Sequence, residues 1–210
     1  MSPGHPSASP SPPIPCELVT WNRFHAMARQ LARRVRESGF HPDTLVAIGR
    51  GGYIPARVLS DFLDLPDLNT FKVEHYQSTK VSRQAVVRYP LSGSLKGRRV
   101  LLVDDVSDSG DTFAAAIRHV KGKGTPAELR TAVLHHKIVS SYTPDYYVHR
   151  IVKWRWIIYP WAVAEDLSSL IGAFARPPWD EAAILKRLAE DHGVRLPRPL
   201  LRDVLDMMAG

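Results

Sequence analysis

The chain has 210 residues, 44% of them hydrophobic, a length that suits one globular domain with a full core and appendages. Its formal net charge is +7, but the Lys and Arg residues are scattered, so nucleic acid is not the expected partner. No apolar run is long enough to span a membrane, and the first residues lack the pattern of a secretory signal. Cys16 is the single cysteine, so no intrachain disulfide forms and we expect a cytoplasmic protein.

The first part of the chain is predicted to contain an extended tail, a long helix and a strand. Residues 1–16 form a Pro- and Ser-rich tail with too little apolar content to pack, so we expect disorder there. Thr20 is suited to cap a helix over residues 21–37, in which apolar side chains recur at helical spacing, and Gly39 ends it. Residues 45–48 form a short apolar strand that leads into a glycine-rich turn.

Strands and helices alternate through the middle of the chain, which predicts an α/β fold with a mainly parallel twisted sheet flanked by helices. A helix is expected over residues 55–63, and the polar residues 77–98 form a long connection that can hold a hairpin strand over 85–89. Ligands of such sheets bind at the carboxyl ends of the strands. The further expected strands are 71–76, 100–103, 128–134, 146–148 and 155–158.

Residues 163–210 differ from the rest, because they carry helical patterns without strands. One helix is expected over 180–190, with Gly193 ending it, and Pro199 can open another. Two amphipathic helices here can pack on the core, form a dimer contact or cover the site. A DNA-reading helix pair is less expected, because the pair is not rich in exposed arginine. The predicted organisation is therefore the tail, a domain over 17–162 and this C-terminal helical extension.

The most informative segment is residues 99–112. An apolar run predicts a strand buried on both faces, and Asp104 and Asp105 follow it directly. A loop of small and hydroxyl residues then leads to a helical pattern over 113–120. Backbone N–H groups at a helix N-terminus bind phosphate, and carboxylates bind ribose hydroxyls or Mg²⁺. This order of features indicates a phosphorylated sugar as the ligand.

Residues 103–112, Val-Asp-Asp-Val-Ser-Asp-Ser-Gly-Asp-Thr, resemble the 5-phosphoribosyl pyrophosphate (PRPP) binding motif of the type I phosphoribosyltransferases. A Walker-type phosphate loop is excluded, because the chain contains no Gly-Lys-Ser/Thr. The resemblance implies that Asp104 and Asp105 hold the ribose hydroxyls, directly or through Mg²⁺, and that Asp108 is the general base. The PRPP-binding residues that it implies are Asp104, Asp105, Ser107, Asp108, Ser109, Gly110, Asp111 and Thr112.

Further segments resemble the purine branch of this family, in particular the archaeal-type xanthine-guanine and hypoxanthine phosphoribosyltransferases. They are Val19-Thr20-Trp21, residues 48–55, Lys137 ahead of residues 144–148, and residues 156–161. The resemblance implies that Arg50 and Gly51 bind pyrophosphate and that Lys137 contacts the 6-oxo group of a purine.

The same resemblance implies two roles close to the end of the matched region. Trp156 would stack on the base, and the backbone of Ile157 would contact the base edge. Trp154, two residues away, is a competing stacking residue, since residues two apart on a strand share a face.

Together these motifs imply an Mg²⁺-dependent enzyme that transfers the 5-phosphoribosyl group of PRPP to hypoxanthine, xanthine or guanine in purine salvage. A small hood beside the sheet and a homodimer or tetramer are implied as well. Two alternatives stay open: a regulator of this fold that binds PRPP or nucleotides and controls nucleic acid, and a transferase for orotate or adenine. The set of Asp108, Lys137 and Trp156 favours the enzyme that acts on a 6-oxopurine.

The polar segment 77–98 has the length and composition of a lid that closes over PRPP. Lys80, Arg83 or Arg88 within it could reach the pyrophosphate, and the sequence does not choose among them.

Ala162 departs from the family pattern, because relatives place an acid directly after Pro-Trp. The missing carboxylate removes an acceptor for the 2-amino group of guanine, which would favour hypoxanthine. His135 and His136 have no zinc-ligand spacing around them, so we expect a structural or solvated role.

Overall fold

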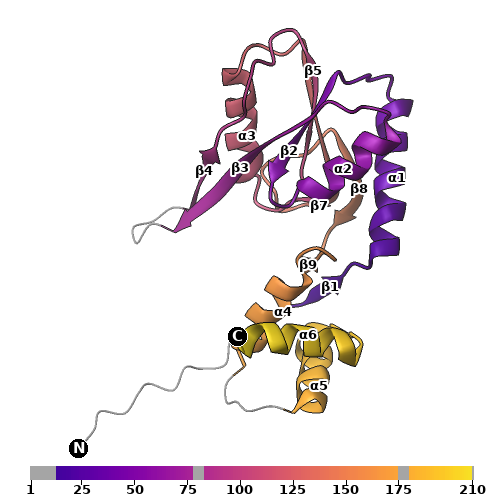
Figure 1. Ribbon diagram of the computed structural model, residues 1–210, viewed down its shortest axis with the longest axis vertical. Coiled ribbons are helices and arrows are strands. Elements are labelled where there is room, and N and C mark those ends of the chain that lie inside the picture. Colours follow the sequence, from indigo (N-terminus) through magenta and orange to yellow (C-terminus); the bar gives the residue numbers. More distant parts are fainter. Residues whose placement is uncertain (1–12, 78–82, 175–179, 210) are drawn as a thin grey trace, which may run out of the picture. The chain divides into compact units, whose positions relative to one another are not determined.

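The computed structural model describes residues 13–77, 83–174 and 180–209, with elements labelled as in Figure 1. The chain divides into two compact units. The larger is His25–Trp154, and the smaller joins Met1–Phe24 to Arg155–Gly210. The domain boundaries expected after residues 16 and 162 stay a prediction.

A seven-stranded sheet forms the centre of the larger unit, in the order β4-β3-β2-β5-β7-β6, with β8 also paired to β7. Every pair is parallel except β3 with β4, which confirms the predicted mainly parallel sheet. The strands are β2 (Thr44–Gly49), β3 (Leu68–Gln77), β4 (Arg83–Tyr89), β5 (Arg99–Val103), β6 (Val106–Ser107), β7 (Glu128–Lys137) and β8 (Tyr146–Ile151).

Helices cover both faces of this sheet, with α3 (Asp111–Gly122) on one side and α1 (Trp21–Glu37) and α2 (Tyr53–Phe62) on the other (Figure 1). The predicted helix 21–37 is confirmed to the residue, and Thr20 caps it, since its Oγ1 accepts from Arg23 N at 3.2 Å. Gly39 has φ +76°, a left-handed conformation that ends the helix with no side-chain penalty.

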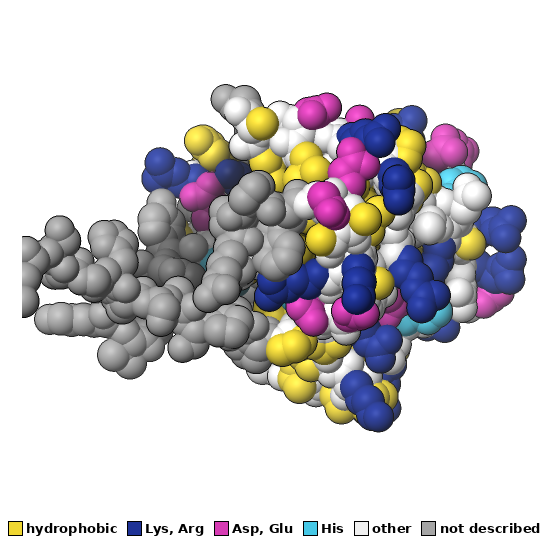
Figure 2. Space-filling model, turned by 90° about the horizontal axis from the view of Figure 1, so that it is seen from below, with side chains coloured by type: hydrophobic (Ala, Val, Ile, Leu, Met, Phe, Trp, Pro, Cys, Tyr) yellow, Lys and Arg dark blue, Asp and Glu magenta, His cyan; other side chains and the backbone are white. Residues whose placement is uncertain are grey.

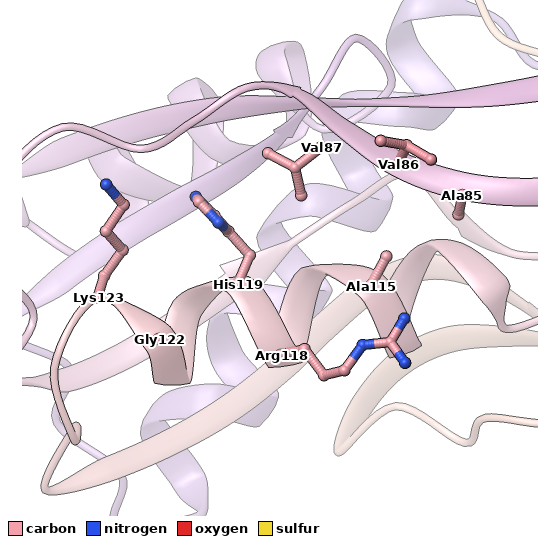
Figure 3. Close-up of a pocket in the computed structure, with 8 residues that line it drawn as sticks. All are labelled: Ala85, Val86, Val87, Ala115, Arg118, His119, Gly122 and Lys123. Carbon is pink, nitrogen blue, oxygen red and sulfur yellow. The ribbon is translucent and has the colours of Figure 1, made fainter.

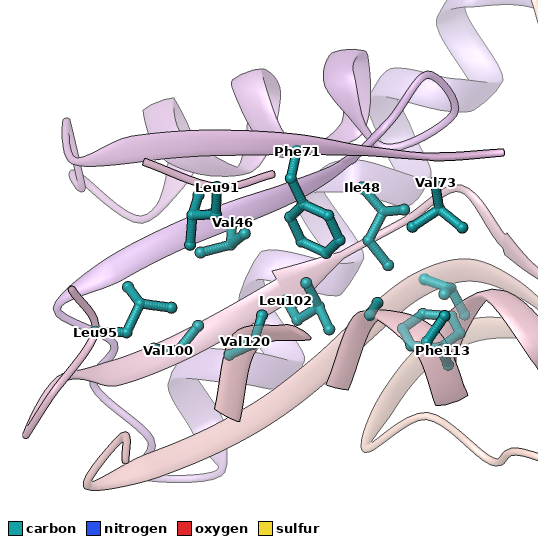
Figure 4. Close-up of a cluster of buried hydrophobic side chains, with 13 residues drawn as sticks. Val46, Ile48, Phe71, Val73, Leu91, Leu95, Val100, Leu102, Phe113 and Val120 are labelled. Carbon is teal, nitrogen blue, oxygen red and sulfur yellow. The ribbon is translucent and has the colours of Figure 1, made fainter. Parts of the chain in front are cut away.

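The core under α3 is built from alternate residues of neighbouring strands (Figure 4). Val46 and Ile48 of β2 pack with Phe71 of β3 and Leu102 of β5, and Phe113 covers them from α3. Burial of each such side chain contributes about 1.5–3 kcal/mol, so this core fixes the strand ends that carry the site.

In the predicted lid, residues 77–98, the described part after residue 82 is the strand β4 followed by an anchored connection; residues 78–82 lie outside the described residues. β4 pairs antiparallel with β3, which confirms the hairpin strand expected over 85–89. Leu91 and Leu95 are buried in the core, so the part of the segment after β4 is fixed to the sheet. The predicted movement over a ligand is therefore not expected for the connection after β4. Arg83 and Arg88 lie on β4, and Lys80 lies outside the described residues.

The smaller unit contains a second sheet that the sequence analysis missed. Strand β9 (Trp156–Ile158) pairs in parallel with β1 (Cys16–Leu18), so the expectation that 155–158 joins the main sheet was wrong. Trp156 N also donates to Pro15 O at 2.8 Å. Cys16, placed in the tail by the sequence analysis, is thus a strand residue. The partner strands are far apart in the chain, and no local pattern reveals such a pairing.

Helices α4 (Val163–Gly172), α5 (Glu181–His192) and α6 (Arg198–Ala209) complete the smaller unit. The two predicted C-terminal helices are confirmed: Asp180 caps α5 by accepting from Ala183 N at 2.6 Å, and Gly193 ends it at φ +70°. Helix α4 was not predicted. Its Leu167 packs with β9, α5 and α6 in a core of the unit's own. Among the described residues, no helix has the length and apolarity needed to cross a membrane.

Candidate active site

Two acidic residues extend the central strand β5 at its carboxyl end. Asp104 N donates to Ala132 O of β7 at 3.1 Å, and Asp105 O accepts from Leu134 N at 3.0 Å. The backbone of the acidic pair is therefore held in the plane of the sheet. On its other side, β5 pairs with β2 up to Val103. The loop that follows β2 therefore begins beside the acidic pair.

The glycine-rich turn after β2 meets this acidic pair, as the sequence predicted. A Cβ atom on Gly51 would lie 2.6 Å from the carboxylate of Asp105, and one on Gly52 would lie 2.3 Å from Val103 O. Only glycine permits this close approach of the two loops. Arg50 is exposed within the turn, and the Gly49–Arg50 peptide bond is cis. The predicted pyrophosphate residues and acidic residues thus lie together.

Asp104 is a buried carboxyl group, 7% exposed, whose Oδ1 accepts from Asp105 N at 2.9 Å. Burial raises the pKa of Asp104 well above its usual range, and the charge of Asp105 raises it further. A carboxylate in this setting gains stability from a cation.

The acidic pair fits Mg²⁺ in the manner of substrate-linked sites. Within the described residues, no three His, Cys, Asp or Glu side chains gather as a metal cage. Mg²⁺ commonly uses one or two carboxylates together with substrate phosphates and water, and Asp104 and Asp105 supply such a pair.

The loop between β6 and α3 is the predicted phosphate site, and a neighbouring segment braces it. Gly110 precedes α3 at φ +97°, and a Cβ atom there would lie 2.4 Å from Ser141 Oγ. Ser109 O accepts from Ser141 N and from Ser141 Oγ, each at 2.9 Å. Ser107 Oγ lies 2.8 Å from Ser140 Oγ and donates to Tyr142 O at 3.0 Å.

The end of the loop is held by its own side chains and by β3. Ser109 Oγ donates to Asp111 Oδ2 at 2.9 Å, and Thr112 Oγ1 lies 3.0 Å from His75 Nε2. The loop is thereby fixed where the first N–H groups of α3 begin, an arrangement that binds phosphate.

Asp108 and Lys137 form an ion pair, although 29 positions separate them. Strand β6 pairs with β7 through Ser107 and His136, which sets the next residue of each strand side by side. Lys137 Nζ lies 2.8 Å from Asp108 Oδ2; the lysine side chain is 2% exposed and the aspartate side chain 41%. The predicted general base is therefore accessible and the predicted base-contacting cation is buried behind it.

Trp154 belongs to the same unit as this pair. It precedes β9, so the argument that Trp154 and Trp156 share one strand face does not apply. Lys137 Nζ lies 4.6 Å from the centroid of the Trp154 ring, a cation–π contact.

Trp156 and Ile157 lie on β9 of the smaller unit, so the predicted base-binding residues are divided between the two units. The exposed Trp156 donates its Nε1–H to Asp166 Oδ1 of α4 at 3.0 Å, and Ile157 is buried. Burial raises the pKa of Asp166 to about 6; the Trp156 hydrogen bond opposes this rise and the Glu165 charge adds to it. Asp166 was not predicted as a partner of Trp156.

The family model described as "Phosphoribosyl transferase domain" matches residues 17–166, more than half of the chain. This chain belongs to the phosphoribosyltransferase family. The predicted resemblance is thereby confirmed, and the fold is the phosphoribosyltransferase fold.

The similar proteins include members of the purine branch of the phosphoribosyltransferase family. The chain is 29% identical to a xanthine-guanine phosphoribosyltransferase of Nitratidesulfovibrio vulgaris, over 68% of this chain and 82% of that protein. A purine phosphoribosyltransferase structure from Pyrococcus horikoshii is 38% identical, with a TM-score of 0.62, covering 70% of this chain and 93% of the other. A hypothetical protein of Neisseria gonorrhoeae with bound ppGpp is 29% identical, with a TM-score of 0.63, covering 70% and 89%.

Several residues that brace the predicted phosphate loop were missed in the sequence. A hydroxyl-rich turn after β7 could have indicated a brace for another polar loop; its residues are Ser140, Ser141 and Tyr142.

His135 and His136 are buried, so the structural alternative holds for both. Burial lowers the pKa of His136, and Arg150 lowers it further.

A hollow of about 450 Å³ opens elsewhere in the larger unit, between β4 and α3 (Figure 3). Val86 and Val87 line one side, and Ala115 and Arg118 line the other. None of the predicted site residues lines it; those of the larger unit lie at the carboxyl ends of its strands instead.

Proposed function

We propose that this chain transfers the 5-phosphoribosyl group of PRPP to a 6-oxopurine, namely hypoxanthine, xanthine or guanine. The products are the nucleoside 5′-monophosphate and pyrophosphate, as in purine salvage. The observation that carries the proposal is the ion pair of Asp108 and Lys137, 2.8 Å apart, directly beside the braced phosphate loop. A 6-oxopurine needs a carboxylate that accepts the proton of its ring N–H and a cation that binds its 6-oxo oxygen.

The donor half of the reaction uses the larger unit. The bond from the anomeric carbon to a pyrophosphate oxygen breaks, and pyrophosphate leaves with the electron pair. The backbone of residues 107–112 and the start of α3 bind the 5′-phosphate, and Arg50 and Gly51 bind the pyrophosphate. Mg²⁺ held by Asp104 and Asp105 would neutralise the leaving pyrophosphate as a Lewis acid.

The acceptor half supplies the nucleophile. A purine nitrogen forms the new bond to the anomeric carbon, and its proton passes to the Asp108 carboxylate. Lys137 donates to the 6-oxo group, Trp156 stacks on the ring, and the backbone of Ile157 contacts the base edge. General-base catalysis of this kind contributes typically ~10²–10⁴-fold.

A panel of bases tests the proposal. The chain is incubated with PRPP, Mg²⁺ and each of hypoxanthine, xanthine, guanine, adenine and orotate, and pyrophosphate release is measured. We expect release with the 6-oxopurines only. Release with orotate or adenine alone, or with none of the five, would overturn the proposed substrate class.

Ala162 supports a preference for hypoxanthine among the 6-oxopurines. It sits at the N-cap of α4, and Asp166, an acid within the first turn of that helix, accepts a hydrogen bond from the Trp156 indole. We therefore expect hypoxanthine to compete at least as well as guanine when both are present with limiting PRPP. Strong guanine preference would count against this part of the proposal.

A regulatory ligand is a second candidate, because a structurally similar protein contains bound ppGpp. This nucleotide combines a guanine base with pyrophosphate groups, the two chemical classes that the proposed site handles. We expect ppGpp to inhibit transfer competitively with PRPP. Inhibition that does not weaken as PRPP increases would contradict a shared site.

Nucleic-acid control is less favoured. Helix α6 carries Arg198 and Arg202 together with Asp203 and Asp206, and Arg202 Nε lies 2.7 Å from Glu181 Oε1. Figure 2 shows dark-blue Lys and Arg side chains interspersed with acidic ones on the face in view. A mobility shift that weakens steeply with salt would revive the regulator alternative.

A further inference from the structure

Trp154 lies in the connection between β8 and β9, and its indole is 44% exposed. The ammonium group of Lys137 is 4.6 Å from the centroid of this ring. The face of an indole attracts a cation through its quadrupole, more strongly than the face of Phe or Tyr. The contact gives Trp154 a direct influence on a residue of the proposed base site.

Lys137 needs such partners because a buried cation is costly unless other groups compensate for its lost hydration. Its side chain is 2% exposed, and Asp108 Oδ2 is 2.8 Å from its Nζ. The carboxylate and the indole face are therefore two groups that stabilise the ammonium where it stands.

The proposed reaction draws on one of these two groups. Asp108 must accept the purine proton, and a carboxylate that does so no longer provides a full counter-charge to Lys137. The indole face attracts a cation without accepting an N–H hydrogen bond, so the donors of Lys137 stay available to Asp108 and to the 6-oxo group. The ammonium then keeps one attractive partner throughout the proton transfer.

We propose that Trp154 is a positioning residue, which holds the Lys137 ammonium in place while Asp108 acts as the base. The inference rests on the proposed function. It assigns the two tryptophans different roles: Trp156 contacts the base, and Trp154 acts through Lys137.

Steady-state kinetics of the full chain test this assignment. Trp154→Ala is expected to raise KM for the preferred 6-oxopurine about tenfold, within the range of a cation–π contact, and to change KM for PRPP less than about twofold. Trp154→Phe retains a ring face and recovers most of the loss. Val152→Ala serves as the matched control, because Val152 lies in the same connection and is 64% exposed. Thermal unfolding of each variant checks that it is folded.

A double-mutant cycle with Lys137→Met separates action through Lys137 from direct contact with the base. If Trp154 acts through Lys137, Trp154→Ala has no further effect on purine KM in the Lys137→Met background. An undiminished effect there would overturn the proposal and assign Trp154 to the base itself. Equal loss of PRPP and purine binding would overturn it in favour of a general structural role.

A readout without turnover distinguishes failure of the inference from failure of the proposed function. Lys137 is labelled with an amine-reactive reagent and quantified by mass spectrometry in the wild type, Trp154→Ala and Trp154→Phe. We expect faster labelling in Trp154→Ala than in Trp154→Phe. If the wild type transfers to no purine but Lys137 is still labelled faster in Trp154→Ala than in Trp154→Phe, only the proposed function is overturned. If the labelling rate of Lys137 is the same in the wild type and both variants, the inference is overturned.

Discussion

The two halves of the site are built in different ways. The donor half comes from a continuous segment after β5 and the turn after β2, and it uses mainly backbone, glycines and two carboxylates. The residues proposed for the acceptor half come from separate parts of the chain: Lys137 contacts Trp154 in the larger unit, and Trp156 contacts Asp166 in the smaller. The proposed phosphate site is therefore a local feature of the sequence, whereas the contacts of the proposed base-binding residues depend on long-range folding.

Asp108 belongs to the loop of the donor half and forms an ion pair with Lys137 of the acceptor half. Its substitution should therefore distinguish the effects of the two halves most clearly. Asp108→Asn is expected to lower turnover by ~10²–10⁴-fold, because the amide cannot take the purine proton. The dissociation constant of PRPP should change little, since the loop binds phosphate mainly through its backbone. Turnover is followed by pyrophosphate release and PRPP affinity by calorimetry. Equal loss of turnover and of PRPP affinity would remove Asp108 from the role of base.

Gly110→Ala tests the donor half through stability and PRPP binding rather than through turnover. Residue 110 has φ +97°, and a Cβ atom would lie 2.4 Å from Ser141 Oγ and 2.9 Å from Tyr142 N. Left-handed backbone alone costs an L-residue about 1–2 kcal/mol, and the contact with the Tyr142 backbone adds to this. We expect a lower free energy of unfolding in urea and a raised KM for PRPP. Gly122→Ala is the control, since nothing lies within 4 Å of a Cβ atom there. A stable variant with unchanged PRPP binding would refute the bracing role of residues 140–142.

Asp104→Asn is expected to gain stability while it loses function. The folded-state pKa of Asp104 is raised, so the stabilising protonated form is lost as pH rises through that pKa. At neutral pH the amide avoids this cost, and a gain of about 1 kcal/mol would raise Tm by about 2–4 °C. PRPP binding in the presence of Mg²⁺ should weaken, because one of the two carboxylates is gone. A Tm equal to or below that of the wild type would show that the buried carboxyl is not a stability cost.

Local patterns account for what could be predicted. Helix 21–37 has a hydroxyl cap, apolar residues at helical spacing and a terminal glycine, and all three features act within a few residues. The motif over 103–112 is continuous, so the strand, the acidic pair and the helix start follow directly from it. Helix α4 was not predicted, although its pattern was present in the sequence: Leu167, Leu170 and Ile171 lie at helical spacing after the acidic first turn.

Long-range contacts account for what could not be predicted. The pairing of β1 with β9 joins Cys16 to Trp156, and three-residue strands carry no pattern that names a partner. The contact of Trp154 with Lys137 depends on how two connections end beside each other. The sequence favoured Trp156 for the base by resemblance and kept Trp154 as a competing stacking residue, but it gave no sign of the contact between Trp154 and Lys137.

Asp166→Asn gives the smallest expected effect and tests the acceptor half in the smaller unit. The pKa of Asp166 is raised from 3.8 to about 6, so the folded protein holds this proton more tightly than the unfolded chain between those values. Wild-type stability should therefore fall as pH rises from about 4 to about 6, by at most about 1–2 kcal/mol because the group is partly solvated. The advantage of Asp166→Asn over the wild type should grow across this window and stay constant above about pH 7. Glu165→Gln removes only the Glu165 charge, a lesser cause of this pKa shift than burial, so it should show only a small part of this advantage. Purine KM should be unchanged in Asp166→Asn, because the amide oxygen still accepts from the Trp156 indole. It should rise several-fold in Asp166→Ala, because one hydrogen bond is lost. Equal KM values in the two variants would mean that the indole of Trp156 does not depend on Asp166 for its orientation.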